Sequence, residues 1–260
     1  PATTADTVAQ HLIWTDAKSK RRVLRDILRH ESVKNAVVFC NRKRDISILV
    51  KSLTTHGFSV VALHGDMTQS ARLEALQRFK DGEVPLMIAS DVAARGLDIA
   101  GLSHVFNFDV PNHAEDYVHR IGRTGRAGKS GRAFTIAASK DDHKYIGFIE
   151  TLTGKPIPLV RIIDGKVIDS KSKEPIEKAF LEFKNIKCTE IVRATAQNVE
   201  TNCVFATDST GIFFMNSDSY GLCPDNPVKI KIRKVGYKTK EMELNQGHLI
   251  SDLIVELEKE

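Results

Sequence analysis

The sequence predicts an α/β domain built on a mostly parallel sheet, followed by a smaller all-β sandwich domain. Strand-like apolar runs alternate with helical stretches up to about residue 158, which is typical of a doubly wound sheet. Beyond that point, short β-branched runs are separated by turns and no long helical period intervenes. The balance of charge also changes near Pro158. We therefore expect two domains, at residues 1–158 and 159–260.

Five apolar runs in the first part have the length of buried strands, at residues 36–40, 60–63, 86–89, 104–108 and 132–136. Apolar residues at helical spacing fill the stretches 18–28, 44–53, 69–79, 113–121 and 141–152. Thr68 is expected to cap the third of these helices. The alternation predicts parallel strands, because each helix carries the chain back to the start of the next strand.

The second part contains short alternating runs that we interpret as strands, at residues 160–163, 166–168, 179–183, 204–206, 212–215, 228–233 and 252–257. Turn-forming residues lie between them, at Asp164-Gly165 and in the stretches 224–227 and 245–247. This pattern of about seven strands predicts a small antiparallel sandwich.

Composition and charge restrict the function further. Of the 260 residues, 42% are hydrophobic and 27% are charged, as in globular proteins. The absence of a long apolar run and of a signal-peptide pattern predicts a soluble chain with no membrane partner. The residues before Pro158 carry six more positive than negative charges, which predicts a polyanionic partner. The four cysteines show no close pairing, so we expect a reducing compartment and no metal site.

Polar residues follow four of the predicted strands at the point where each strand ends. Asn41 and Arg42 follow the first strand, His64-Gly65-Asp66 the second, Ser90 and Asp91 the third, and Asp109 the fourth. Ligands of open α/β sheets bind outside the carboxyl ends of the strands. The sequence therefore predicts a binding rim at this edge of the sheet.

Residues 119–126, which read His-Arg-Ile-Gly-Arg-Thr-Gly-Arg, place three arginines at three-residue spacing with glycines between them. Guanidinium groups pair bidentately with phosphate oxygens, and the glycines would let the backbone approach a ligand. A solvated basic turn is the alternative, which the glycine spacing disfavours. We expect Arg123 and Arg126 to face the rim where Asn41, Gly65 and Asp98 gather.

These eight residues resemble the sixth motif of DEAD-box RNA helicases, which supplies arginine fingers to ATP from the second of two RecA-like domains. The leading His119 favours the DEAD-box branch among related helicases. The resemblance implies that Arg123 and Arg126 are catalytic and contact the γ-phosphate. It also implies that His119 communicates between the nucleotide and RNA sites, although a core position is an alternative for His119. Arg120 is expected to brace the motif.

Residues 89–99 are similar to the fifth motif of the same family. The similarity implies that the Ser90 hydroxyl contacts RNA and that Gly96 and Asp98 face ATP, with Asp98 bonded to the ribose. Asp91 and Arg95 are expected to pair with other motifs. A helix-capping Asp and a surface Arg are the alternative interpretation.

Two earlier segments also resemble RNA-binding motifs of this family. Residues 37–41 resemble the fourth motif, which implies that Asn41 and Arg42 contact the RNA backbone. The Gln-x-x-Arg element that ends at Arg72 implies a phosphate contact by Arg72, and Gly65 would let a backbone N–H approach phosphate. An ordinary capped helix with a surface arginine is the alternative.

The parts of an ATPase that bind metal and the β/γ-phosphates are missing from this sequence. No Asp-Glu-Ala-Asp run occurs, and Gly128-Lys129-Ser130 lacks the first glycine of a phosphate-binding Walker loop. The resemblance therefore implies a cytoplasmic second motor domain of an ATP-dependent RNA helicase. A separate first RecA-like domain would hold ATP and Mg²⁺, and this chain should not hydrolyse ATP alone.

Segments 165–169, 173–176, 207–213 and 235–237 resemble carboxypeptidase regulatory-like domains, which are transthyretin-like sandwiches mostly found in exported proteins. The resemblance implies a stabilising or binding role and no catalytic residues. The pairing with a helicase half allows two accounts, a natural fusion or an artificial joining of unrelated domains. As a rival function, the sandwich is the principal module and the first half is a non-catalytic RNA-binding platform.

Overall fold

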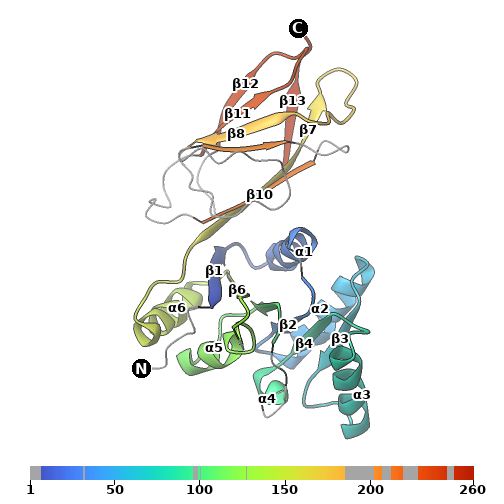
Figure 1. Ribbon diagram of the computed structural model, residues 1–260, viewed down its shortest axis with the longest axis vertical. Helices are drawn as coiled ribbons and strands as arrows, with labels where there is room; N and C mark the ends of the chain where they lie inside the picture. Colours follow the sequence, from blue (N-terminus) through green and yellow to red (C-terminus); the bar gives the residue numbers. More distant parts are fainter. Residues whose placement is uncertain are drawn as a thin grey trace. The chain divides into compact units, whose positions relative to one another are not determined.

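The computed structural model describes residues 7–31, 33–95, 99, 101–126, 128–184, 202–206, 212–218, 228–244 and 249–260. The chain forms two compact units, residues 1–157 and 158–260, which we call the first and second units (Figure 1).

The first unit is built on a six-stranded sheet in the order β1-β6-β5-β2-β4-β3, and every neighbouring pair is parallel. The predicted parallel sheet is therefore confirmed. Its strands are β1 (Val8–Trp14), β2 (Ala36–Phe39), β3 (Val60–Leu63), β4 (Leu86–Ala89), β5 (His104–Asn107) and β6 (Gly131–Ala137).

Strand β1 was not predicted from the sequence, because polar residues interrupt its apolar run. Among the described strands it lies at the edge of the sheet, and its one neighbour is β6. The polar His11 is nevertheless 5% exposed, and its ring stacks on Phe134 of β6 with centroids 4.5 Å apart. A histidine ring with this packing contributes to the core as an aromatic side chain does.

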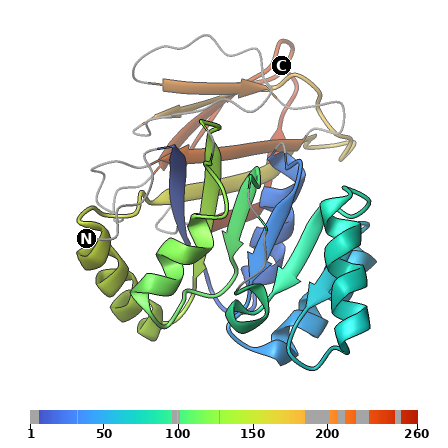
Figure 2. The same cartoon turned by 60° about the horizontal axis from the view of Figure 1, so that its bottom comes forward.

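Six helices of the described chain surround this sheet, and Figure 2 shows them arranged around the strands. They are α1 (Lys20–His30), α2 (Lys43–Thr55), α3 (Gln69–Lys80), α4 (Asp91–Ala94), α5 (Ala114–Ile121) and α6 (Lys140–Thr153). All five predicted helices are present, and α4 is a single additional turn. The predicted cap of α3 is confirmed, because the Thr68 hydroxyl accepts a hydrogen bond from the backbone N–H of Ala71.

The second unit contains two sheets, in the orders β10-β7-β13 and β12-β11-β8-β9. Their strands are β7 (Val160–Asp169), β8 (Phe180–Lys184), β9 (Asn202–Ala206), β10 (Ile212–Asp218), β11 (Val228–Arg233), β12 (Lys240–Leu244) and β13 (Leu249–Leu257). The expectation of a wholly antiparallel arrangement is wrong for one pair, because β13 runs parallel to β7.

The predicted turn at Asp164-Gly165 is also wrong. Both residues lie inside the ten-residue strand β7, which replaces the two strands expected at 160–163 and 166–168. Asp164 pairs with Phe214 of β10, and Gly165 pairs with Phe213 of β10 and Leu253 of β13. Pairing on both sides holds this stretch extended, so the local turn preference is overridden.

Strand β12 was also missed, because its Lys-Glu-Met-Glu-Leu sequence is mostly charged. Among the described strands it pairs with β11 alone and lies at the edge of its sheet, a position where charged side chains are favourable. The predicted turns at 224–227 and 245–247, and most of the segment 207–213, lie outside the described residues.

Side chains from both sheets of the second unit contribute to one buried cluster. Val167, Val255 and Leu257 come from the β7-β13 side, and Leu181 and Ile230 from the β8-β11 side. The two sheets therefore share a single apolar core.

Candidate functional site

The carboxyl ends of neighbouring strands bring four predicted RNA-binding residues to the same edge of the first unit. Asn41 and Arg42 follow β2, Gly65 follows β3, and Ser90 follows β4. Because β2, β4 and β3 are adjacent and parallel, these residues lie along one rim, as predicted. Arg42 and Gly65 are exposed, and Ser90 is half-buried at the start of α4.

Arg120 lies buried beneath this rim, with 1% of its surface exposed. Its Nε and one terminal nitrogen form a bidentate pair with Asp91, at 2.7 and 2.6 Å. Further hydrogen bonds reach the carbonyl of Asp109 at 2.8 Å and the side-chain oxygens of Asn41 at 2.8 Å and Asn107 at 3.4 Å. All five N–H donors of the guanidinium are therefore used. The predicted bracing role of Arg120 and the pairing of Asp91 are confirmed.

Asn41 is held by the same network. Its Nδ2 donates to the carbonyl of Val110 at 2.8 Å, and its backbone N–H donates to Asp109 Oδ2 at 3.0 Å. Lys20 Nζ lies 2.8 Å from the other carboxylate oxygen of Asp109. Arg120 also donates to the side-chain oxygen of Asn41. Both polar atoms of the Asn41 side chain are therefore bonded to the protein, and these bonds hold the chain in place where β2 ends.

Two further arginines near this rim also contact the protein. Arg95 Nη2 lies 2.6 Å from Asp116 Oδ1 on α5, just before the motif at residues 119–126. Arg72 on α3 donates to the carbonyl of Ala93 at 3.4 Å. The predicted phosphate-binding Arg72 therefore lies against the short helix that follows Ser90.

The arginine loop, which we define as residues 122–130 between α5 and β6, lies at the opposite end of the sheet. The backbone N–H of Leu102, just before β5, donates to the carbonyl of Arg123 at 3.1 Å. The hydroxyl of Thr7, just before β1, donates to the carbonyl of Gly125 at 2.6 Å. The loop therefore borders the amino ends of the strands.

This placement corrects the expectation that Arg123 and Arg126 face the rim of Asn41 and Gly65. Helix α5 starts after the carboxyl end of β5 and carries the chain back to the amino end of β6. Arg123 is half-buried, Arg126 is exposed, and His119 is exposed on α5, so the core position for His119 is wrong. The predicted nucleotide-binding Gly96 and Asp98 lie outside the described residues.

Two glycines of the arginine loop, Gly122 and Gly125, lie in close contact with the protein itself. Gly125 has φ +68°, and a Cβ there would lie 2.5 Å from Val8 Cγ2 of β1. A Cβ on Gly122 would lie 3.0 Å from the carbonyl oxygen of Val118. Packing within the protein accounts for both glycines, and the expectation that they let the backbone approach a ligand stays a prediction.

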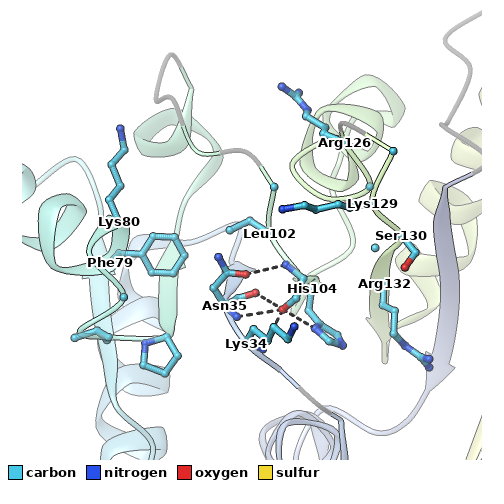
Figure 3. A pocket seen from close by; sticks show the side chains of 18 residues that line it. Lys34, Asn35, Phe79, Lys80, Leu102, His104, Arg126, Lys129, Ser130 and Arg132 are labelled. Atoms are coloured by element: carbon cyan, nitrogen blue, oxygen red, sulfur yellow. Dashed lines mark hydrogen bonds between the residues drawn. The ribbon is translucent and has the colours of Figure 1, made fainter.

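A hollow of about 820 Å³ lies beside the arginine loop at the amino ends of the strands, and we call it the amino-end pocket (Figure 3). Among the described residues that line it there is no aspartate or glutamate. Figure 3 shows Lys129 extending over Leu102 into the pocket and Arg126 at its rim. The positively charged residues that line the pocket are Lys34, Lys80, Arg126, Lys129 and Arg132.

A polar network supports one wall of this pocket. The backbone N–H groups of Lys34 and Asn35 donate to the Ser103 hydroxyl at 3.1 Å, and the backbone N–H of Ser103 donates to Asn35 Oδ1 at 2.8 Å. His104 Nδ1 lies 3.0 Å from the same hydroxyl. These bonds join the chain before β2 to the chain before β5.

Glu31 at the end of α1 extends the network to β6. Its carboxylate lies 3.2 Å from Arg132 Nε and 3.5 Å from His104 Nε2. Burial alone would raise the pKa of Glu31, but the close approach of the His104 ring and the charge of Arg132 lower the pKa below its ordinary value. Glu31 is therefore charged at neutral pH and holds Arg132 in place.

Sequence reasoning did not single out Lys34, Lys80 and Lys129 as site residues. Lys34 precedes β2, Lys80 ends α3 and Lys129 precedes β6, so only the fold brings them to one pocket. No cluster of three or more His, Cys, Asp or Glu side chains that could hold a metal occurs in the described part of the chain. No helix among the described residues has the length and apolar character needed to cross a membrane.

The parallel sheet, its helices and the arginine loop define the first unit as a RecA-like α/β domain. Residues 19–128 match the family described as the helicase conserved C-terminal domain. DEAD-box ATP-dependent RNA helicase CshA of Bacillus subtilis is 44% identical over 138 residues, which are 53% of this chain and 28% of the relative. ATP-dependent RNA helicase CshA of Listeria monocytogenes is 41% identical over 152 residues, 58% of this chain and 29% of the relative. The chain thus spans less than a third of the length of these relatives.

Solved structures agree with this relation. The crystal structure of E. coli DEAD-box protein SrmB bound to regulator of ribonuclease activity A is 35% identical, with a TM-score of 0.56. The match covers 58% of this chain and 89% of that one. A DEAD box protein from the hyperthermophile Methanococcus jannaschii is also 35% identical, with a TM-score of 0.55, and the match covers 59% of this chain and 42% of that one. Through its first unit, the chain belongs to the C-terminal helicase domains of DEAD-box RNA helicases.

Proposed function

We propose that the first unit is the second motor domain of an ATP-dependent RNA helicase. The observation that carries the proposal is the arginine loop, which the fold holds beside a positively charged pocket in a DEAD-box C-terminal domain. Arg123 and Arg126 would contact the γ-phosphate of ATP, with Gly96, Asp98 and His119 serving the same nucleotide. Arginine fingers contribute about 10³–10⁵ in rate when metal and an oriented water are present.

We propose that RNA binds at the other end of the sheet, along the rim that follows β2, β3 and β4. Arg42, Gly65 and Ser90 are accessible there to a sugar-phosphate backbone, and Asn41 and Arg72 would position or extend these contacts. Such contacts carry no base identity, so binding should be indifferent to sequence and should weaken steeply with salt. RNA and nucleotide would then lie at opposite ends of one sheet.

ATP and Mg²⁺ would be held by a first RecA-like domain, because the metal-binding and Walker motifs are missing from this sequence. The chain alone should therefore hydrolyse no ATP. Mixing it with the first RecA-like domain of a DEAD-box protein, ATP, Mg²⁺ and RNA should produce hydrolysis. Full helicase turnover by the chain alone would contradict the split-site proposal.

Replacing one arginine tests the role of the loop. In the mixed assay, Arg123→Ala should lower the hydrolysis rate by about 10³-fold or more. Arg44→Ala, which removes an exposed arginine from α2, should leave the rate unchanged. An unchanged rate for Arg123→Ala would favour the rival function, in which the first unit is a non-catalytic RNA-binding platform and the second unit is the principal module.

We propose that the second unit is an accessory sandwich of the carboxypeptidase regulatory-like type. The shared core between its two sheets supports this assignment. The unit would fold independently and contribute stability or binding. Limited proteolysis with a protease of broad specificity should yield two resistant fragments separated near Pro158, whereas a chain resistant throughout would argue for one integrated fold.

A further inference from the structure

The amino-end pocket carries more positive charge than the proposed nucleotide contacts use. Three lysines come to it from separate parts of the chain. Lys34 precedes β2, Lys80 ends α3, and Lys129 belongs to the arginine loop. Only Arg126 among the five charged lining residues has a role in the proposed contact with ATP.

Among the described residues, four of the five cations that line this pocket have no acidic partner. In the described part of the chain, Lys34, Lys80, Arg126 and Lys129 form no ion pair, and each of these residues is exposed. Only Arg132 faces a carboxylate, that of Glu31. A concave surface lined by one sign of charge focuses its field into the hollow and attracts counter-ions. The pocket therefore favours an anion that several cations can neutralise together.

The size of the pocket and the glycines that line it indicate which kind of anion would fit. Its volume of about 820 Å³ is far larger than one phosphate group requires. Gly82, Gly101 and Gly128 line it with left-handed backbone, and a Cβ at any of them would meet no atom within 4 Å. The wall at these glycines is thus open to a ligand. A chain of linked phosphates would fit both the volume and the spread of the cations.

We propose that the amino-end pocket binds a linear polyphosphate group, and that Lys34 and Lys80 hold the part of it that lies beyond Arg126. The inference rests on the proposed function in one respect, which is the proposed contact of Arg126 with phosphate. It goes beyond that function because the pocket lies within the first unit, so the chain should bind polyphosphate without a first RecA-like domain. The polyphosphate could be the triphosphate of a nucleotide or a free inorganic chain.

Isothermal titration of the full chain with sodium tripolyphosphate, and separately with ATP, tests the proposal. The double variant Lys34→Ala/Lys80→Ala should weaken binding of tripolyphosphate by about tenfold or more. Lys18→Ala/Lys51→Ala removes the same charge from exposed positions outside the pocket and should change the affinity less than about twofold. If ATP binding weakens in parallel, the ligand is the nucleotide triphosphate, whereas an effect confined to tripolyphosphate identifies a free chain.

Three results would overturn the inference. The first is no binding of either probe, and the second is equal weakening by both double variants, which would indicate nonspecific attraction. The third is loss of binding on Arg126→Ala with no effect of Lys34→Ala/Lys80→Ala, which would confine the site to the arginine loop. That third result leaves the proposed ATPase role intact, because the mixed hydrolysis assay with Arg123→Ala tests it separately.

Discussion

Replacing Arg120 by alanine should destabilise the first unit more than any exposed arginine change. The side chain is 1% exposed and uses its five donors on Asp91, Asn41, Asn107 and the Asp109 carbonyl. Its removal leaves the Asp91 carboxylate, which is 22% exposed, without its cation. Breaking a buried pair in this way costs about 3–5 kcal/mol.

That loss is large against the total stability of a domain, which is about 5–15 kcal/mol. With a urea dependence of about 2 kcal/mol per molar, the midpoint of unfolding should fall by about 1.5–2.5 M. The cation also rests on the ring of Phe39, with its central carbon 5.1 Å from the centroid, and this contact is lost as well. We therefore expect the upper part of the range.

The single tryptophan makes the measurement specific to the first unit. Trp14 ends β1 and stacks on His143 of α6, with ring centroids 3.9 Å apart. Its fluorescence should change when β1 and α6 separate, and the second unit contributes no tryptophan signal. Urea titration of the full chain, followed at the emission of Trp14, therefore reports unfolding of the unit that contains Arg120.

Arg95→Ala is the matched control. The Arg95–Asp116 pair has the same 2.6 Å separation as the Arg120–Asp91 pair, but the Arg95 side chain is 63% exposed. Water and salt screen an exposed pair, so its loss should leave the urea midpoint nearly unchanged. Equal shifts for the two variants would refute the reasoning, because they would show that burial does not set the cost.

Two further predictions follow from single residues. Gly125→Ala should lower the urea midpoint of unfolding, measured by Trp14 fluorescence, because the added Cβ would overlap Val8. Gly128 has the same left-handed backbone but no such overlap, so Gly128→Ala should lower the midpoint less. In the second unit, the backbone N–H of Ser172 and then that of Lys171 lower the pKa of Asp169 to about 2. Because this pKa is below the ordinary value of about 3.9, the stabilisation is present above pH 4 and is lost as the pH falls towards 2. Hydrogen exchange of residues 166–176 should show that step in the wild type and none in Asp169→Asn.

Much of the first unit could be predicted from the sequence because two of its central strands, β2 and β4, are short and wholly apolar. All four residues of β2 and all four of β4 are apolar and buried, so these runs mark the two strands clearly. Strand β1 could not be recognised, since its His11 is buried by stacking on a strand more than a hundred residues later. In the second unit, pairing on both sides of β7 overrides the Asp164-Gly165 turn preference.

The amino-end pocket could not be predicted, because no local pattern joins the residues that form it. Lys34, Lys80 and Lys129 are far apart in sequence, and each alone is an ordinary exposed lysine. Parallel topology brings them together, since the chain before β2, the end of α3 and the chain before β6 all lie at the same end of the sheet. Of this site, the sequence predicts only the arginine loop, because that loop carries a recognisable motif.

The three arginines in residues 119–126 are equally spaced but have different roles, because their surroundings differ. A three-residue spacing places side chains on one face only while a helix continues, and α5 ends at Ile121. Arg120 lies inside the helix and is saturated by protein acceptors, so no donor remains for a ligand. Arg126 lies beyond the helix and is exposed beside the amino-end pocket. Burial and the end of one helix therefore decide which guanidinium groups of the motif can reach a phosphate.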